Sequence, residues 1–334
     1  MNGRLGYIDA LRGFSMLLVV FAHVMLSAGV GDNHTVLSTA LKTFRMPLFF
    51  FVSGFFASRM HGEWTTQKIR LTLRRKVCAQ IIGMLVFLGI YCYCHNLSLF
   101  TAKGWGFGGY WFTLSLFQMY VVYLAFSLVL KKYGNTAYFA AAVLLYVSVG
   151  KNIASPPVEG YLFVNNTVTY MPYFALGILA RNYRDQFTSL IRHQIFATAA
   201  IVLFTVGLLL IYDRGLLEAS RWAYLLNRNV IVRVAGLASV FILFHSLRDR
   251  LDGQGLTARA LRYTGRHTLE IYYLHYLLVP KLGELSPFLR TEGKTIVIII
   301  LLGTVTVAVT AVALLLGRWL RCSIPLARIL FGEK

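Results

Sequence analysis

Residues 295–317 read TIVIIILLGTVTVAVTAVALLLG, a run without a single charged side chain. An α-helix needs roughly 20 mainly apolar residues to cross the hydrocarbon core of a bilayer, so this run predicts a membrane-spanning helix. The whole chain has the same character, because 57% of its 334 residues are hydrophobic and only 14% are charged. A soluble domain is nearer half apolar and a quarter charged. The composition therefore excludes an ordinary soluble enzyme, a disordered chain and a small disulfide scaffold.

Apolar runs long enough to cross a bilayer recur along the whole chain. We count ten, at about 8–30, 36–58, 77–95, 110–130, 136–150, 161–180, 194–213, 225–246, 268–283 and 295–317. Lys and Arg fall more than twice as often on one side of these runs as on the other, and cytoplasmic loops retain positive charge during insertion. We predict an all-α polytopic membrane protein with about ten transmembrane helices and both termini in the cytoplasm. Residues 1–334 are expected to form a single domain without an appended soluble domain.

The formal net charge of +20 has two readings. In a soluble protein it would indicate nucleic-acid binding. Most of the basic residues here stand in short segments between apolar runs, where membrane topology and anionic lipid head groups account for them. We therefore expect contact with the lipid bilayer and no nucleic acid. The four cysteines lack the CxxC spacing of a zinc site and no other group has metal-ligand spacing, so no metal is expected.

The first apolar run carries three ionisable residues, Asp9, Arg12 and His23. Ionisable groups within a span are costly and are functional candidates by default. Arg12 and His23 fall within about 20° of one helix face and about 16 Å apart along the axis. A neutral imidazole in a dry site suits a general base, and the alternative is a packing histidine bonded to a neighbouring helix. Asp9, one turn before Arg12, is expected to pair with it.

The densest charge cluster is segment 68–76, which we interpret as a cytoplasmic loop. Arg70 and Arg74 lie one helical turn apart, with Arg75 beside them, and guanidinium groups bind phosphates through paired hydrogen bonds. The spacing favours a nucleotide-containing cosubstrate. Ordinary retention of positive charge on the cytoplasmic side is the alternative account.

Three further features bear on packing. In the second run, Pro47 is expected to interrupt the helix and Gly54 to permit a close approach of backbones. The segment 104–109 matches GxGxxG, but it follows no strand and is interleaved with aromatic residues, so we interpret it as an interfacial loop. His275, one turn after Tyr272 in the ninth run, either shapes a cavity or packs.

Five segments, met in order along the chain, together resemble the acyltransferase-3 family of bacterial membrane acyltransferases. They are 7–13 (YIDALRG) leading to His23, 46–54 (MPLFFFVSG), 110–114 (YWFTL), 171–177 (MPYFALG) and 263–275 (YTGRHTLEIYYLH). The resemblance spans nearly the whole chain. It implies a ten-helix enzyme of the bacterial cytoplasmic (inner) membrane. Such an enzyme transfers an acyl group, usually acetyl, from cytosolic acyl-CoA to a hydroxyl of an extracytoplasmic acceptor, mostly a cell-surface carbohydrate.

The resemblance also implies roles for individual residues. His23 would be the catalytic histidine and Arg12 its partner, in a site that includes Asp9. The family's Arg-x-x-Arg element after the second helix is not reproduced, which leaves open whether Arg70, Arg74 and Arg75 bind CoA together with Arg12. The oxyanion formed in acyl transfer needs hydrogen-bond donors. Candidates on the substrate side are Ser53, Trp111, Tyr272 and His275, or a freed backbone N–H.

A second hypothesis comes from a different class of protein. The same intramembrane charges would suit a transporter or flippase for an anionic solute or a lipid-linked glycan. Such proteins are commonly built from internal repeats, and none is visible in this sequence. The sequence does not identify the acceptor or the acyl chain, and it leaves open whether a homodimer forms.

Overall fold

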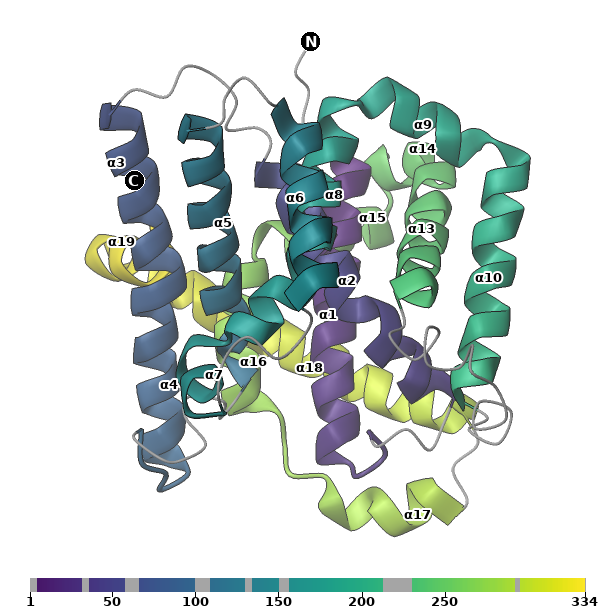
Figure 1. Cartoon of the computed structure of the whole chain (residues 1–334). Coiled ribbons are helices and arrows are strands. Elements are labelled where there is room, and N and C mark those ends of the chain that lie inside the picture. The colour runs from purple at the N-terminus through teal and green to yellow at the C-terminus, as the bar shows by residue number, and fades with distance from the viewer. Residues whose placement is uncertain are drawn as a thin grey trace. The chain divides into compact units, whose positions relative to one another are not determined.

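A computed structural model of the chain describes residues 5–31, 36–57, 66–99, 109–129, 134–149, 156–212, 230–291 and 295–333. Every regular element within these ranges is a helix, and the long helices coincide with apolar runs of the sequence (Figure 1). The predicted all-α membrane fold is confirmed.

The chain divides into two compact units, which are described separately. Unit 1 comprises Met1–Phe49, Tyr183–Thr268 and Leu278–Val312, and unit 2 comprises Phe50–Asn182, Leu269–Leu277 and Ala313–Lys334. The long helices α2 (Val36–Ala57) and α18 (Thr295–Arg321) contribute residues to both units. Helix α2 continues through Pro47, so the predicted interruption is wrong. A proline lacks only its own backbone N–H, so the flanking turns of the helix keep their hydrogen bonds.

Helix α1 (Gly6–Ser27) is central to unit 1. It packs against α15 (Leu256–Arg266), α14 (Arg248–Asp252) and α13 (Val230–Ser246). Helix α13 in turn lies beside α10 (Gln194–Tyr212), as Figure 1 shows, and α9 (Arg184–Arg192) contacts both. The short elements η5 (Gly283–Leu285) and α17 (Ser286–Thr291) complete the unit. The approach of α1 to α15 depends on Gly13, where a Cβ would overlap the carbonyl oxygen of Leu261.

In unit 2, the C-terminal part of α2 is followed by one long helix formed by α3 (Thr66–Lys76), the π-helical turn η2 (Val77–Ile82) and α4 (Gly83–Cys94) (Figure 1). The unit continues with α5 (Trp111–Val129), α6 (Gly134–Val149), α7 (Pro156–Leu162), α8 (Val164–Asn182), α16 (Thr268–Leu278) and α19 (Ile324–Phe331). The loop predicted for segment 68–76 is therefore wrong. That segment contains no Gly or Pro and is rich in Leu, Lys and Arg, which favour a helix.

Two glycines let α2 and α8 cross closely within unit 2. A Cβ on Gly54 would overlap the carbonyl oxygen of Phe174, and a Cβ on Gly177 would overlap that of Phe51. Small residues at such crossings allow backbones to approach, which is a common device of membrane helices. The close approach expected at Gly54 is confirmed.

Six helices in the described part of the chain are long and apolar enough to cross a membrane: Gly6–Ser27, Val36–Ala57, Thr66–Cys94, Trp111–Leu128, Gln194–Ile211 and Ile296–Arg321. Gly134–Ser148 and Val230–Ser246 are shorter apolar helices. The predicted run 161–180 overlaps α8, and the run 268–283 contains the short α16. The total of ten spans and the side of each terminus stay predictions.

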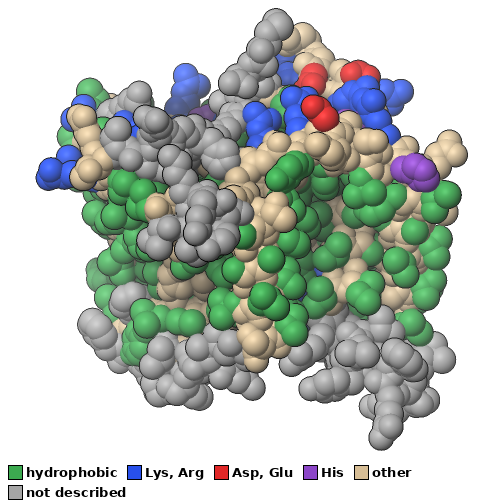
Figure 2. Space-filling view, turned by 45° about the horizontal axis from the view of Figure 1, so that its top comes forward, with side chains coloured by type: hydrophobic (Ala, Val, Ile, Leu, Met, Phe, Trp, Pro, Cys, Tyr) green, Lys and Arg blue, Asp and Glu red, His purple; other side chains and the backbone are tan. Residues whose placement is uncertain are grey.

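The surface of these helices suits lipid. Along α10, Ile195 is 75% exposed, and Ile201, Val202, Leu203, Val206 and Leu209 are each about half exposed. Figure 2 shows hydrophobic side chains over the middle of one face, with Lys and Arg gathered along its upper edge. Exposed apolar side chains along a whole helix are rare on a soluble monomer and are typical of a membrane-facing or partner-facing surface.

Candidate functional site

Helix α1 positions the two residues expected to carry the chemistry. Arg12 and His23 are both half-buried within unit 1. The helix runs from Gly6 to Ser27, so His23 lies one turn before its end, nearer that end than the middle of the helix. The imidazole and the guanidinium are thus on similar faces of one rigid helix but near opposite ends of it.

The carboxylate of Asp9 lies beside a residue of another helix of unit 1. The Asp9 side chain is fully buried, and its Oδ2 lies 3.4 Å from Nε of Arg266 on α15. Nearby, the backbone N–H of Tyr7 donates a hydrogen bond of 2.6 Å to the carboxylate of Asp252 on α14. These contacts fix the first turn of α1. The sequence reasoning missed Arg266 as a partner of Asp9, although both belong to segments of the family pattern. The Asp9–Arg12 pair stays a prediction.

The four candidate donors, Ser53, Trp111, Tyr272 and His275, all belong to unit 2. An aromatic cluster connects the three helices that carry them, α2, α5 and α16. Phe50, on the same helix as Ser53, lies 6.3 Å from Trp111 between ring centroids, and Phe112 lies 5.4 Å from Tyr272. Trp111 also stacks on Tyr170 at 5.8 Å.

Two of these candidate donors, Tyr272 and His275, have backbone carbonyl oxygens as hydrogen-bond partners. The hydroxyl of Tyr272 donates to the carbonyl oxygen of Gly109 at 2.8 Å, which engages its single proton. His275 is fully buried, and its Nδ1 lies 2.9 Å from the carbonyl oxygen of Ile271. A carbonyl only accepts, so Nδ1 carries a proton. Of the glycine-rich segment 104–109, all but Gly109 lies outside the described residues.

A basic cleft of about 270 Å³ opens in unit 2 between the end of α3, η2 and the C-terminal segment. Its lining consists of Leu71, Arg74, Arg75, Cys78, Arg328, Ile329, Gly332 and Glu333. Arg74 and Arg75, predicted to bind the cosubstrate, thus face the cleft together. Arg70 is exposed on the same helix and does not line it. Arg328 is the residue that sequence reasoning missed, because more than 250 positions separate it from Arg75 and only the fold brings them together.

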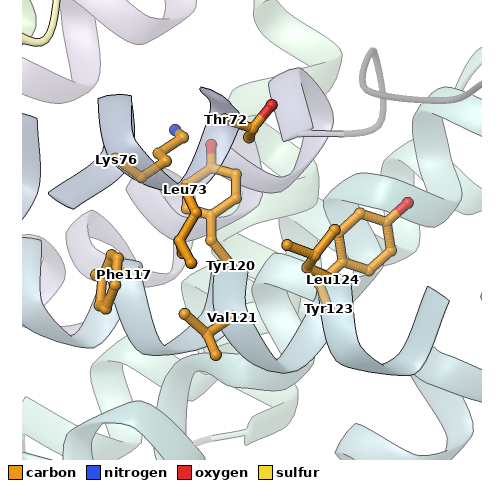
Figure 3. Close-up of a pocket in the computed structure, with 8 residues that line it drawn as sticks. All are labelled: Thr72, Leu73, Lys76, Phe117, Tyr120, Val121, Tyr123 and Leu124. Carbon is orange, nitrogen blue, oxygen red and sulfur yellow. The ribbon is translucent and has the colours of Figure 1, made fainter. Parts of the chain in front are cut away.

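A second, much smaller cavity of about 20 Å³ lies between α3 and α5. Figure 3 shows Lys76 and Tyr120 at its edge, where the Lys76 ammonium lies 3.5 Å from the centre of the Tyr120 ring. The volume has room for about one water molecule. This cavity therefore belongs to the packing of α3 on α5, where the cation–π contact directs Lys76 away from the basic cleft.

Among the described residues, no group of three or more His, Cys, Asp or Glu side chains could hold a metal ion. The groups available are an imidazole, buried carboxylates and guanidinium groups. Such a set can bind anions and transfer protons.

Fold and site together define a helical membrane protein with ionisable side chains on the apolar helix α1 of unit 1 and a basic cleft in unit 2. A model of the acyltransferase-3 family, described as an acyltransferase domain, matches residues 5–315. The chain belongs to this family and is a membrane acyltransferase. No curated protein and no solved structure matches the chain.

Proposed function

We propose that this protein is an acyl-CoA-dependent O-acyltransferase of the bacterial cytoplasmic membrane. It would transfer an acyl group, which we propose is acetyl, to a hydroxyl of an extracytoplasmic carbohydrate. The observation that carries the proposal is the placement of Arg12 and His23 on one helix, both half-buried, in a chain of the acyltransferase-3 family. The family match also favours group transfer over the transport hypothesis.

His23 is the proposed general base. The acceptor oxygen attacks the thioester carbonyl carbon while the imidazole takes the hydroxyl proton. The C–S bond then breaks, the sulfur leaves with a proton, and the products are an ester and free CoA. A positioned base of this kind contributes about 10²–10⁴-fold to the rate.

The basic cleft supports the donor half of the proposal. CoA carries a diphosphate and a 3′-phosphate, and guanidinium groups bind phosphate oxygens with two parallel hydrogen bonds. Arg74 and Arg75 line the cleft side by side at the end of α3. Arg12, on α1, is the second proposed contact to the donor. Arg70 does not line the cleft and is assigned a weaker, longer-range attraction for the same phosphates.

The acceptor half rests on the family resemblance and on the aromatic cluster of unit 2. Aromatic rings such as Trp111 and Tyr170 present flat apolar faces with a polar edge, a surface that suits a sugar ring. Ser53 and a backbone N–H remain the proposed oxyanion donors. Tyr272 is a weaker candidate, because its proton is engaged by Gly109.

The test is release of free thiol from acetyl-CoA by the purified protein in detergent. His23→Ala is expected to lower the rate at least 100-fold, since the base is lost. His193→Ala is the matched control, because His193 is an exposed residue between α9 and α10. It is expected to retain the wild-type rate.

Two outcomes would contradict the proposal. Unchanged thiol release by His23→Ala would exclude His23 as the base. No release by the wild-type protein, combined with movement of a labelled anionic solute across proteoliposomes, would favour the transport hypothesis instead.

A further inference from the structure

The C-terminal segment lies beyond the part of the chain that the family match covers. The match ends at residue 315, whereas α18 continues to Arg321 and is followed by α19. Helix α19 packs on η2 and α4 within unit 2. This segment thus lies outside the matched range and packs on the long helix α3–η2–α4, which lines one side of the basic cleft.

The tail after α19 is held tightly against the end of α3. Gly332 has a left-handed φ of +66°, and a Cβ there would come within 2.5 Å of the carbonyl oxygen of Arg75. A Cβ on Gly83 would likewise come within 2.7 Å of the carbonyl oxygen of Leu330 on α19. Backbone contacts of this kind leave little freedom, so α19 forms a fixed wall of the cleft.

The cleft carries more positive than negative charge. Arg74, Arg75 and Arg328 line it, and none of them forms an ion pair with a residue that the structure describes. The carboxylate among the lining residues, Glu333, lies 3.0 Å from Nη2 of Arg321 and is neutralised there. Three exposed guanidinium groups around one concave space repel each other unless an anion binds between them.

Arg321 connects this wall to the interior of unit 2. Its Nη2 lies 2.6 Å from Oε1 of Glu270, a residue of α16 that is only 2% exposed. The guanidinium also lies 5.2 Å from the centre of the Phe331 ring, at the end of α19. Arg321 thus holds α16, α19 and Glu333 together, and in doing so fixes the helix that carries Arg328.

We propose that α19 is a phosphate-binding element, in which Arg328 contacts the nucleotide phosphates of the acyl donor together with Arg74 and Arg75, while Arg321 positions the helix. The inference rests on the proposed function, because it takes acyl-CoA as the donor. The cleft volume of about 270 Å³ lies at the lower limit of pockets that enclose a whole small molecule. It therefore suits the phosphates of a larger donor, with the pantetheine arm extending out of it.

The first test compares two donors. Arg328→Gln is expected to raise KM for acetyl-CoA about tenfold with little change in kcat, and to leave KM for S-acetylpantetheine, which lacks the nucleotide, unchanged. Arg318→Gln is the control, because Arg318 is exposed on the last turns of α18 and does not line the cleft. An equal effect on both donors, or an effect on neither, overturns the inference.

A binding measurement separates this inference from the proposed function. Adenosine 3′,5′-bisphosphate is titrated into lipid-free protein in detergent by calorimetry, which requires no turnover. Weaker binding by Arg328→Gln, partly recovered by Arg328→Lys, supports the phosphate site even if the acyl transfer assay fails. If binding appears only when anionic lipid vesicles replace the nucleotide, the cleft binds lipid head groups and the inference is wrong.

The positioning role of Arg321 has its own test. Removing Arg321 alone leaves the buried Glu270 carboxylate without this guanidinium, so the double variant Glu270→Gln with Arg321→Gln is used to preserve the fold. We expect a rise of KM for acetyl-CoA comparable to that of Arg328→Gln, with KM for S-acetylpantetheine unchanged. A lower melting temperature with unchanged KM for acetyl-CoA would show a purely structural role.

Discussion

Gly265 lies directly against Asp9, so closely that a Cβ on the glycine would overlap the carbonyl oxygen of Asp9. The contact lies within unit 1 and joins segment 7–13 of the family pattern to the beginning of segment 263–275. It also explains why Arg266, the next residue, reaches the Asp9 carboxylate. The first turn of the helix that carries Arg12 and His23 is therefore set by a backbone contact that only glycine permits.

Gly265→Ala is expected to destabilise the protein by about 1–3 kcal/mol, because the added methyl group meets backbone atoms that cannot rotate away. Thermal unfolding in detergent, followed by tryptophan fluorescence, measures the change. The matched control is Gly303→Ala on α18, where a Cβ would meet nothing within 4 Å. We expect the control to be neutral or slightly stabilising, since alanine favours a helix. Equal melting temperatures for the two variants would contradict the close contact.

Arg266→Gln is expected to cost about 1–3 kcal/mol, because the buried Asp9 carboxylate loses a charged neighbour. The Asp9 side chain is 1% exposed and that of Arg266 is 49% exposed. Arg259→Gln, an exposed position on the same helix, should change the melting temperature little. The double variant Asp9→Asn with Arg266→Gln should be less destabilised than the sum of the single variants. Strict additivity would mean that the two side chains do not interact.

Tyr272→Phe separates a packing role from an oxyanion role. The phenol hydroxyl donates to Gly109, so its loss is expected to cost about 1 kcal/mol of stability and less than tenfold in kcat. Tyr263→Phe, at an exposed position of α15, serves as the control. A loss of more than 100-fold in kcat at an unchanged melting temperature would instead identify Tyr272 as an oxyanion donor, since one such donor contributes about 10²–10³-fold.

The contact between Lys76 and Tyr120 is suited to a double-mutant cycle. The variants are Lys76→Met, Tyr120→Leu and the pair together, each measured by thermal unfolding. The expected coupling is about 0.5–1 kcal/mol, the usual strength of a cation–π contact near a surface. A coupling near zero would mean that the lysine does not stabilise the packing of α3 on α5.

Part of the candidate site could be predicted from the sequence. Asp9, Arg12 and His23 stand out because charged residues are costly inside an apolar run, whatever the tertiary structure. Arg74 and Arg75 stand out by local density of charge. Two local predictions were wrong, the loop at 68–76 and the helix break at Pro47. At 68–76 the high helix propensity of Leu, Lys and Arg outweighed the density of charge. At Pro47 the backbone hydrogen bonds of the neighbouring turns kept the helix continuous.

The sequence by itself determined the class of this protein, since long apolar runs leave a helix as the way to satisfy the backbone in a bilayer. It also determined the family, because short motifs such as 7–13 and 263–275 are local in the chain. Only the tertiary structure placed Arg266 beside Asp9, Gly54 against α8, and Arg328 opposite Arg74 and Arg75. Those pairs are distant in the chain, and hydrophobic periodicity says which face of a helix is buried but not which other helix covers it.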